Sequence, residues 1–192
     1  MNFTLHDEQS APADANQHLE ATRKAFGMIP NLERVLAGVP PLLELYVHGE
    51  QLIEEHTSLT AVEVNVVMQQ ANYENNCTYC VPWHTLLSRK AGVPDEVIRA
   101  QRDNEPLDDP KLETLRRFAR SLIHHRGHPP DEDVEAMRDA GYEDRQILEV
   151  VLCLAVKTIS NYTNGIAHTP LDDAVHKHAW TRPTAPATEH DT

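Results

Sequence analysis

The sequence is short of positive charge. Its 192 residues include 17 Lys and Arg against 30 Asp and Glu, which gives a formal net charge of −13. A nucleic-acid-binding protein needs a basic stripe that neutralises phosphates, and an anionic membrane surface also attracts basic segments. We therefore expect neither nucleic acid nor a membrane as a partner.

Long apolar runs and a targeting leader are also lacking. No stretch approaches the roughly 18 apolar residues of a membrane-spanning helix. The first residues, from Met1 to Glu8, contain neither a basic nor an apolar region of the kind that opens a signal peptide. Three cysteines are too few for the disulfide scaffold of a small secreted protein. We expect a cytoplasmic protein, in which closely spaced cysteines serve catalysis or metal binding.

No internal repeat is visible, and the chain is long enough for one domain with its own core. We expect residues 1–180 to form that single domain. The last segment, residues 181–192, is polar and contains proline, so it is expected to be a disordered tail.

Amphipathic segments separated by Gly and Pro predict an all-α fold of about nine helices, counting short ones. The expected helices cover residues 16–26, 31–37, 40–56, 61–73, 80–91, 94–103, 109–124 and 131–140, followed by a long apolar helix from about 144. The apolar stripe of that last helix is expected to contain Val150, Val151, Leu154 and Ala155. Cys153 lies in the same run and is expected to be a small core residue.

One segment is ambiguous between helix and strand. Val62, Val64 and Val66 alternate with polar residues, as in a half-buried strand. The alternation fails at the next residue, and no second segment could pair with such a strand. Thr60 and Glu63 have the spacing of a capping box, so we expect a helix.

The most informative motif is Cys77-Thr78-Tyr79-Cys80, with His84 four residues beyond the second cysteine. Two thiols at this spacing can form a disulfide without disruption of the fold. If Cys80 and His84 share a helix, the imidazole leans back toward Cys80 and can accept its proton. Cys77 is about 10 Å from His84 along the axis, too far for direct contact.

Pro82 predicts where this helix begins. Proline is tolerated only in the first turn, so the helix should start near Tyr79 or Cys80, with Cys77 just outside or capping it. Both sulfurs then lie at the positive end of the helix dipole, which favours thiolate. We expect Cys80 to attack and Cys77 to resolve. The reverse assignment stays open, because the N-terminal cysteine is often the nucleophile in other C-x-x-C proteins.

Zinc binding and two inert buried cysteines are the alternative interpretations of the motif. A zinc site would combine Cys77, Cys80 and His84 with a fourth donor such as His48 or His168. Three ligands this close in sequence enclose a tetrahedral ion poorly, and no second C-x-x-C is present. We expect no metal ligands here.

The segment from Leu59 to Gly92 resembles the carboxymuconolactone decarboxylase and AhpD-like alkylhydroperoxidase superfamily. The resemblance is carried by the helix start Leu59-Thr60-Ala61-Val62-Glu63, the redox motif Asn76-Cys77-Thr78-Tyr79-Cys80-x-x-x-His84, and the exit Ala91-Gly92-Val93-Pro94. Upstream Phe26-Gly27-Met28-Ile29-Pro30-Asn31-Leu32 and downstream Asn161-Tyr162-Thr163-Asn164 and Thr169-Pro170-Leu171-Asp172 are similar to a peroxidase-related branch. The resemblance covers most of residues 20–175.

The resemblance implies an all-helical fold that assembles as a dimer, trimer or hexamer. It also implies a Cys77–Cys80 redox pair with His84 in a proton relay, acting on peroxides without haem, flavin or other cofactor. In the family a glutamate usually lies twelve residues before the first cysteine and orients the histidine. Here that position is Asn65, which can hydrogen-bond an imidazole but cannot carry a proton away.

The leading hypothesis is therefore a cofactor-free thiol oxidoreductase that reduces alkyl hydroperoxides and is reset by an external thiol or protein reductant. A carboxymuconolactone decarboxylase-like lyase, in which His84 acts as base and the cysteines are incidental, is the second hypothesis. The third is a non-enzymatic oligomer that senses oxidation through the same pair.

Overall fold

A computed structural model describes residues 3–183, and within that range the chain is helical and contains no strand. This confirms the predicted all-α fold. The elements are η1 (Ala13–Ala15), α1 (Asn16–Phe26), α2 (Asn31–Leu36), α3 (Pro40–His56), α4 (Ala61–Glu74), α5 (Cys80–Lys90), α6 (Asp95–Asp103), α7 (Pro110–His124), α8 (Asp131–Asp139), α9 (Asp144–Ala167) and η2 (Asp173–His178).

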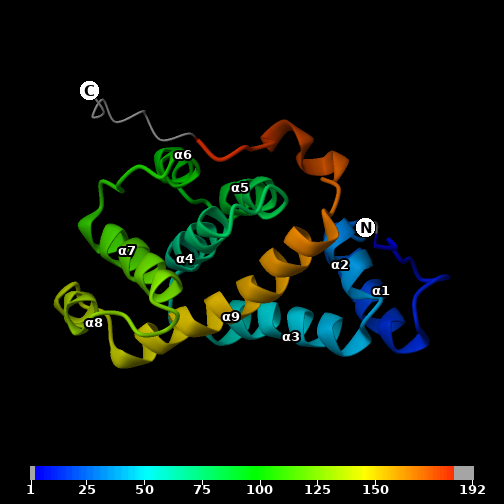
Figure 1. Cartoon of the computed structure of the whole chain (residues 1–192), viewed down its shortest axis with the longest axis horizontal. Helices are drawn as coiled ribbons and strands as arrows, with labels where there is room; N and C mark the ends of the chain where they lie inside the picture. Colours follow the sequence, from blue (N-terminus) through cyan, green and yellow to red (C-terminus); the bar gives the residue numbers. More distant parts are fainter. Residues whose placement is uncertain (1–2, 184–192) are drawn as a thin grey trace, which may run out of the picture.

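Two long helices, α3 and α9, lie side by side along one edge of the molecule (Figure 1). Helix α4 packs against α9, α7 and α5, so it occupies the centre of the bundle. The last described segment, which contains η2, packs back over α5. Helix α5 therefore lies between α4, at the centre of the bundle, and the C-terminal part of the described chain.

The structure settles the ambiguous segment as helix α4. The Thr60 side chain accepts a hydrogen bond from the backbone N–H of Glu63, and the Glu63 carboxylate accepts one from the backbone N–H of Thr60. Every residue from Val66 to Tyr73 is buried. Because the helix is covered on all sides, its apolar residues need not follow a single stripe.

Helix α5 begins at Cys80, as Pro82 predicts. Pro82 is the third residue of the helix, where its missing N–H would have had no partner in the preceding turn. Cys77 lies just outside, in a turn that follows Asn76, whose φ of 50° is left-handed. The turn carries the first thiol to the N-terminal end of the helix that carries the second.

The face that α9 buries differs from the expected apolar stripe. Val151 is 49% exposed and Ala155 is also exposed. The buried residues include Val150, Cys153 and Lys157, followed by the polar residues Ser160, Asn161 and Asn164. Burial of Cys153 is as predicted, but the C-terminal half of α9 turns a polar face into the core.

Helices α3 and α9 approach each other closely at Gly49. A Cβ atom on Gly49 would lie 2.7 Å from Cγ2 of Val156. Any side chain at position 49 would force the two helices apart.

No helix between residues 3 and 183 is both long enough and apolar enough to cross a membrane. Of the expected C-terminal tail, Thr181, Arg182 and Pro183 are described, and the Arg182 guanidinium lies over the Tyr73 ring at 4.6 Å. Residues 184–192, the rest of that expected tail, lie outside the described residues.

Candidate active site

Both cysteines of the motif are buried and reduced, and they contact each other through the start of α5. Cys77 is 5% exposed and Cys80 is 2% exposed. The backbone N–H of Cys80 donates a hydrogen bond to Sγ of Cys77 at 3.2 Å. Cys80 is the first residue of α5, so its sulfur lies at the positive end of that helix.

The surroundings of Cys80 favour its thiolate. Burial by itself raises the pKa of this thiol, but hydrogen bonding to Cys77, the charge of Lys157 and the amides of Asn164 and Asn161 outweigh burial and lower the pKa to about 6. The Nδ2 atom of Asn164 donates to Sγ of Cys80 at 3.3 Å. The Cys77 thiol has a raised pKa, chiefly because it donates its proton toward Cys80.

Lys157 is the cation of this site, and the sequence interpretation missed it. The residue is 1% exposed, and its Nζ lies 2.9 Å from Nε2 of His84. It has no carboxylate within 4.0 Å among the described residues. A buried positive charge without an ion-pair partner is unusual, and here its neighbours are the thiol of Cys80 and the imidazole of His84.

This contact corrects the expected Cys80–His84 pairing. Burial, followed by the charge of Lys157, holds the pKa of His84 well below its usual range, so the imidazole is neutral. Its Nε2 accepts from Lys157, which leaves the ring proton on Nδ1. The structure gives His84 no hydrogen bond to Cys80 within the described chain. A thiolate–imidazolium pair is therefore replaced by a thiolate that faces an ammonium group.

Asn65 is also engaged elsewhere. Its Nδ2 donates to the carbonyl of Ala61 at 2.8 Å, and its Oδ1 accepts from the Ser88 hydroxyl at 2.8 Å. Ser88 lies one helical turn beyond His84 on α5, so Asn65 is near the histidine's helix without bonding its ring. Asn65 therefore does not make the hydrogen bond to the His84 imidazole of which an asparagine at this position is capable.

Two carboxyl groups, Glu33 on α2 and Glu50 on α3, interact electrostatically with the site. Burial raises the pKa of Glu50, and the positive charge of Lys157 lowers it by a smaller amount. The net effect is a raised pKa. Glu33 is 7% exposed, and burial, followed by the charges of Glu50, Asp172 and Cys80, raises its pKa to about 8. Glu33 is thus a buried carboxyl group that keeps its proton at neutral pH.

The C-x-x-C turn is held in place by Asp172, from the segment after α9. The Asp172 carboxylate accepts hydrogen bonds from the Tyr79 hydroxyl at 2.5 Å, the Trp83 indole at 3.0 Å and the backbone N–H of Asn31 at 3.1 Å. The Tyr79 hydroxyl in turn accepts from the backbone N–H of Leu32 at 3.0 Å. These bonds tie the turn to α2 and to the C-terminal part of the chain.

Three buried polar atoms around the thiol have no hydrogen-bond partner among the described residues: Nδ1 of His84, Oδ1 of Asn164 and Oε2 of Glu33. Buried polar groups are nearly always paired, so such atoms mark positions where a water or a substrate is expected to bind. Within residues 3–183 no group of three or more His, Cys, Asp or Glu side chains is placed to hold a metal ion.

Neither a family model nor a curated protein matches the sequence. Solved structures do match the fold. An uncharacterized peroxidase-related protein from Ralstonia eutropha JMP134, described as an alkylhydroperoxidase AhpD core, has a TM-score of 0.79 and 20% identity over 91% of this chain and 93% of its own. A peroxidase-related protein from Silicibacter sp. TM1040 has a TM-score of 0.76 and 17% identity over 92% of this chain and 93% of its own.

A third similar structure is a variant of the debrominase Bmp8 in complex with 2,3,4-tribromopyrrole. It has a TM-score of 0.77 and 13% identity over 92% of this chain and 95% of its own. At these identities the likeness concerns the fold, and it extends over nearly the whole length of each chain. The chain therefore has the AhpD-like helical fold, as the resemblance of its C-x-x-C segment predicts.

Proposed function

We propose that this protein is a cofactor-free thiol oxidoreductase that reduces hydroperoxides through Cys77 and Cys80. The observation that carries the proposal is the environment of Cys80. This thiol has a lowered pKa, begins a helix, contacts a second thiol three residues away and faces the buried charge of Lys157. These are the conditions under which a cysteine becomes a reactive thiolate.

The reaction begins with attack of the Cys80 thiolate on one oxygen of the peroxide. The S–O bond forms as the O–O bond breaks, so that sulfur is oxidised to a sulfenic acid and the departing alkoxide takes up a proton to become an alcohol. The Cys77 thiol then attacks the sulfenic acid, forming the disulfide and releasing water. An external dithiol reduces that disulfide by exchange and restores both thiols.

Lys157 and His84 together supply the positive charge and the proton that the site needs, although position 65 is Asn instead of the glutamate usual in the family. The ammonium group stabilises the attacking thiolate, which needs a nearby positive charge in a buried site. The proton on Nδ1 of His84 has no partner and can pass to the departing alkoxide. A proton from Lys157 can then replace it across the 2.9 Å hydrogen bond to Nε2.

The proposed partners are a small peroxide and an external thiol or protein reductant in the cytoplasm. Assembly as a homo-oligomer, which the family resemblance implies, belongs to the same proposal. It is supported by four apolar side chains that α9 leaves exposed: Leu148, Val151, Tyr162 and Ile166.

The test is consumption of cumene hydroperoxide with dithiothreitol as reductant. Cys77→Ala and Cys80→Ala should each abolish turnover. Cys153→Ala should keep it, because Cys153 is buried with a pKa that burial raises to about 12. Unchanged turnover in both motif variants would end the proposal.

The same variants separate the alternatives. A lyase of the decarboxylase type would keep its activity after alkylation of all thiols. A redox sensor would change its assembly state on oxidation without consuming peroxide over many cycles. Since a debrominase with a similar fold was solved in complex with 2,3,4-tribromopyrrole, the same variants should also be assayed for debromination of that compound.

A further inference from the structure

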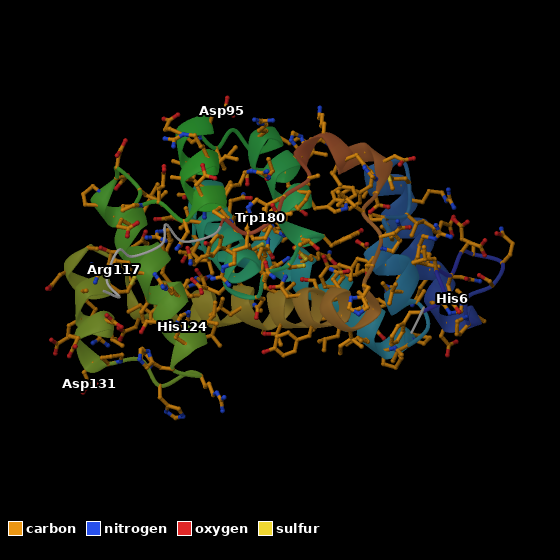
Figure 2. All side chains as sticks on the ribbon, turned by 45° about the horizontal axis from the view of Figure 1, so that its top comes forward. His6, Asp95, Arg117, His124, Asp131 and Trp180 are labelled. Atoms are coloured by element: carbon orange, nitrogen blue, oxygen red, sulfur yellow. The ribbon has the colours of Figure 1, made fainter. Side chains whose placement is uncertain are left out.

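A cavity whose lining contains no cysteine lies between α5, α6 and η2. Its volume is about 630 Å³, within the range of roughly 300–1,000 Å³ that holds small organic ligands. None of the residues that contact the Cys80 thiol lines it. Asp95, labelled in Figure 2, lies at the start of α6 on its border.

The lining of this cavity is positively charged in a strongly acidic chain. Arg89, Arg99, Arg102 and Lys177 contribute four positive charges, and only two acidic residues line the same space. Arg89 pairs with Asp95, which lines the cavity, and Arg99 pairs with Glu105, which does not. Within the described residues neither Arg102 nor Lys177 has a carboxylate within 4.0 Å.

Hydrogen bonds hold the Arg102 side chain in position but use only some of its guanidinium N–H groups. Its Nη1 donates to the Thr85 hydroxyl at 2.8 Å and to the carbonyl of His178 at 3.1 Å, and its Nη2 donates to the carbonyl of Ala179 at 3.2 Å. Five N–H groups are available on a guanidinium, so one on Nε and one on Nη2 remain. Such a pair can bind two oxygens of one anion.

His178 provides a second, independent indication of a ligand. Its side chain is 7% exposed and lines the cavity, yet Nε2 has no hydrogen-bond partner among the described residues. Burial, followed by the charges of Arg89, Lys177 and Arg102, lowers the pKa of this histidine. A neutral imidazole with a free nitrogen beside an anchored arginine can donate to an oxyanion.

We propose that this cavity binds a small molecule that carries a phosphate group. Arg89 and Arg99 are already paired with carboxylates, so the cations available to a ligand are Arg102 and Lys177. Two available cations match a dianionic phosphate better than a single carboxylate. The volume leaves room for an organic part, and Ile98, 3% exposed, offers it an apolar contact. This inference does not depend on the peroxide chemistry, because the two sites share no residue.

The test is isothermal titration calorimetry on the full chain at constant ionic strength, with inorganic phosphate, ribose 5-phosphate and acetate as probes. Phosphate should bind saturably, ribose 5-phosphate should bind at least as tightly, and acetate should bind more weakly. Lys177→Gln should weaken phosphate binding by about tenfold or more, which is typical for loss of a charged hydrogen bond. Lys24→Gln on α1, which removes the same charge far from the cavity, should change nothing.

Two results would overturn the proposal. One is the absence of saturable binding of either phosphate probe. The other is equal weakening by Lys177→Gln and Lys24→Gln, which would show only general attraction of anions. Because Lys177 is exposed and makes no side-chain hydrogen bond or ion pair with residues 3–183, its variant is expected to fold normally. Tighter binding of inorganic phosphate than of ribose 5-phosphate would contradict the proposed organic part of the ligand and leave only the free ion.

Discussion

Nζ of Lys157 and Nε2 of His84 lie 2.9 Å apart in the core of this protein, although the two residues are 73 positions apart in sequence. The contact places a positive charge beside the Cys80 thiol and fixes which nitrogen of the imidazole carries its proton. Lys157 therefore does for this site what a charged histidine would do in a pair with Cys80.

Lys157→Met should raise the pKa of Cys80, because it removes the positive charge and keeps most of the side-chain volume. At pH 5, below the Cys80 pKa of about 6, a shift of one unit would slow alkylation of Cys80 by iodoacetamide by about tenfold, because the thiolate fraction falls in that proportion. The measurement is the alkylation rate of the Cys80 peptide against pH, followed by mass spectrometry. Lys90→Met, at the exposed end of α5, is the matched control. An unchanged midpoint in Lys157→Met would contradict the assigned role.

Glu33→Gln should change how stability depends on pH. The folded protein holds a proton on Glu33 up to about pH 8, whereas the unfolded chain releases it near its ordinary pKa of 4.5. A raised carboxyl pKa means that the wild type loses stability as pH rises through that window, while glutamine does not titrate. Urea unfolding should show that the free energy of unfolding of the variant, relative to that of the wild type, rises by at least about 1 kcal/mol from pH 5 to pH 8.

The control for that experiment is Glu135→Gln, on the exposed face of α8. The free energy of unfolding of this control should depend on pH in the same way as that of the wild type over the same range. A constant difference between Glu33→Gln and the wild type would show that the carboxyl group is ionised in the folded state.

Asp172→Ala should destabilise the fold, because it leaves two buried donors, on Tyr79 and Trp83, and the half-buried N–H of Asn31 without their acceptor. Each unsatisfied group costs about 1–3 kcal/mol, so a loss of about 3 kcal/mol or more is expected in urea unfolding. Asp173→Ala, one residue further and fully exposed, should stay within about 0.5 kcal/mol of the wild type. Equal effects of the two substitutions would show that the Asp172 bonds contribute nothing.

The sequence was most informative where local chemistry decides the structure. Pro82 located the start of α5, and the Thr60–Glu63 spacing identified α4 in spite of its strand-like alternation. Both rest on backbone groups within a few residues of each other, which a sequence pattern contains.

The partners of the thiols were missed because they come from distant segments. Lys157 belongs to α9, Glu33 to α2 and Asp172 to the segment beyond α9. A signal for Lys157 was present: it lies seven residues after Val150 and four after Cys153, the spacing of one helix face. The exposed apolar residues of α9 obscured this spacing, because they led to the prediction that a different face of the helix is buried.

Gly49 has a consequence for the charge at the centre of the site. Val156, which its missing side chain accommodates, immediately precedes Lys157 on α9. The closeness of α3 to α9 thus helps to set the depth at which the ammonium group is held. A residue that takes no part in the chemistry, and has no side chain at all, therefore adjusts the electrostatic potential at the sulfur by governing where a neighbouring helix lies.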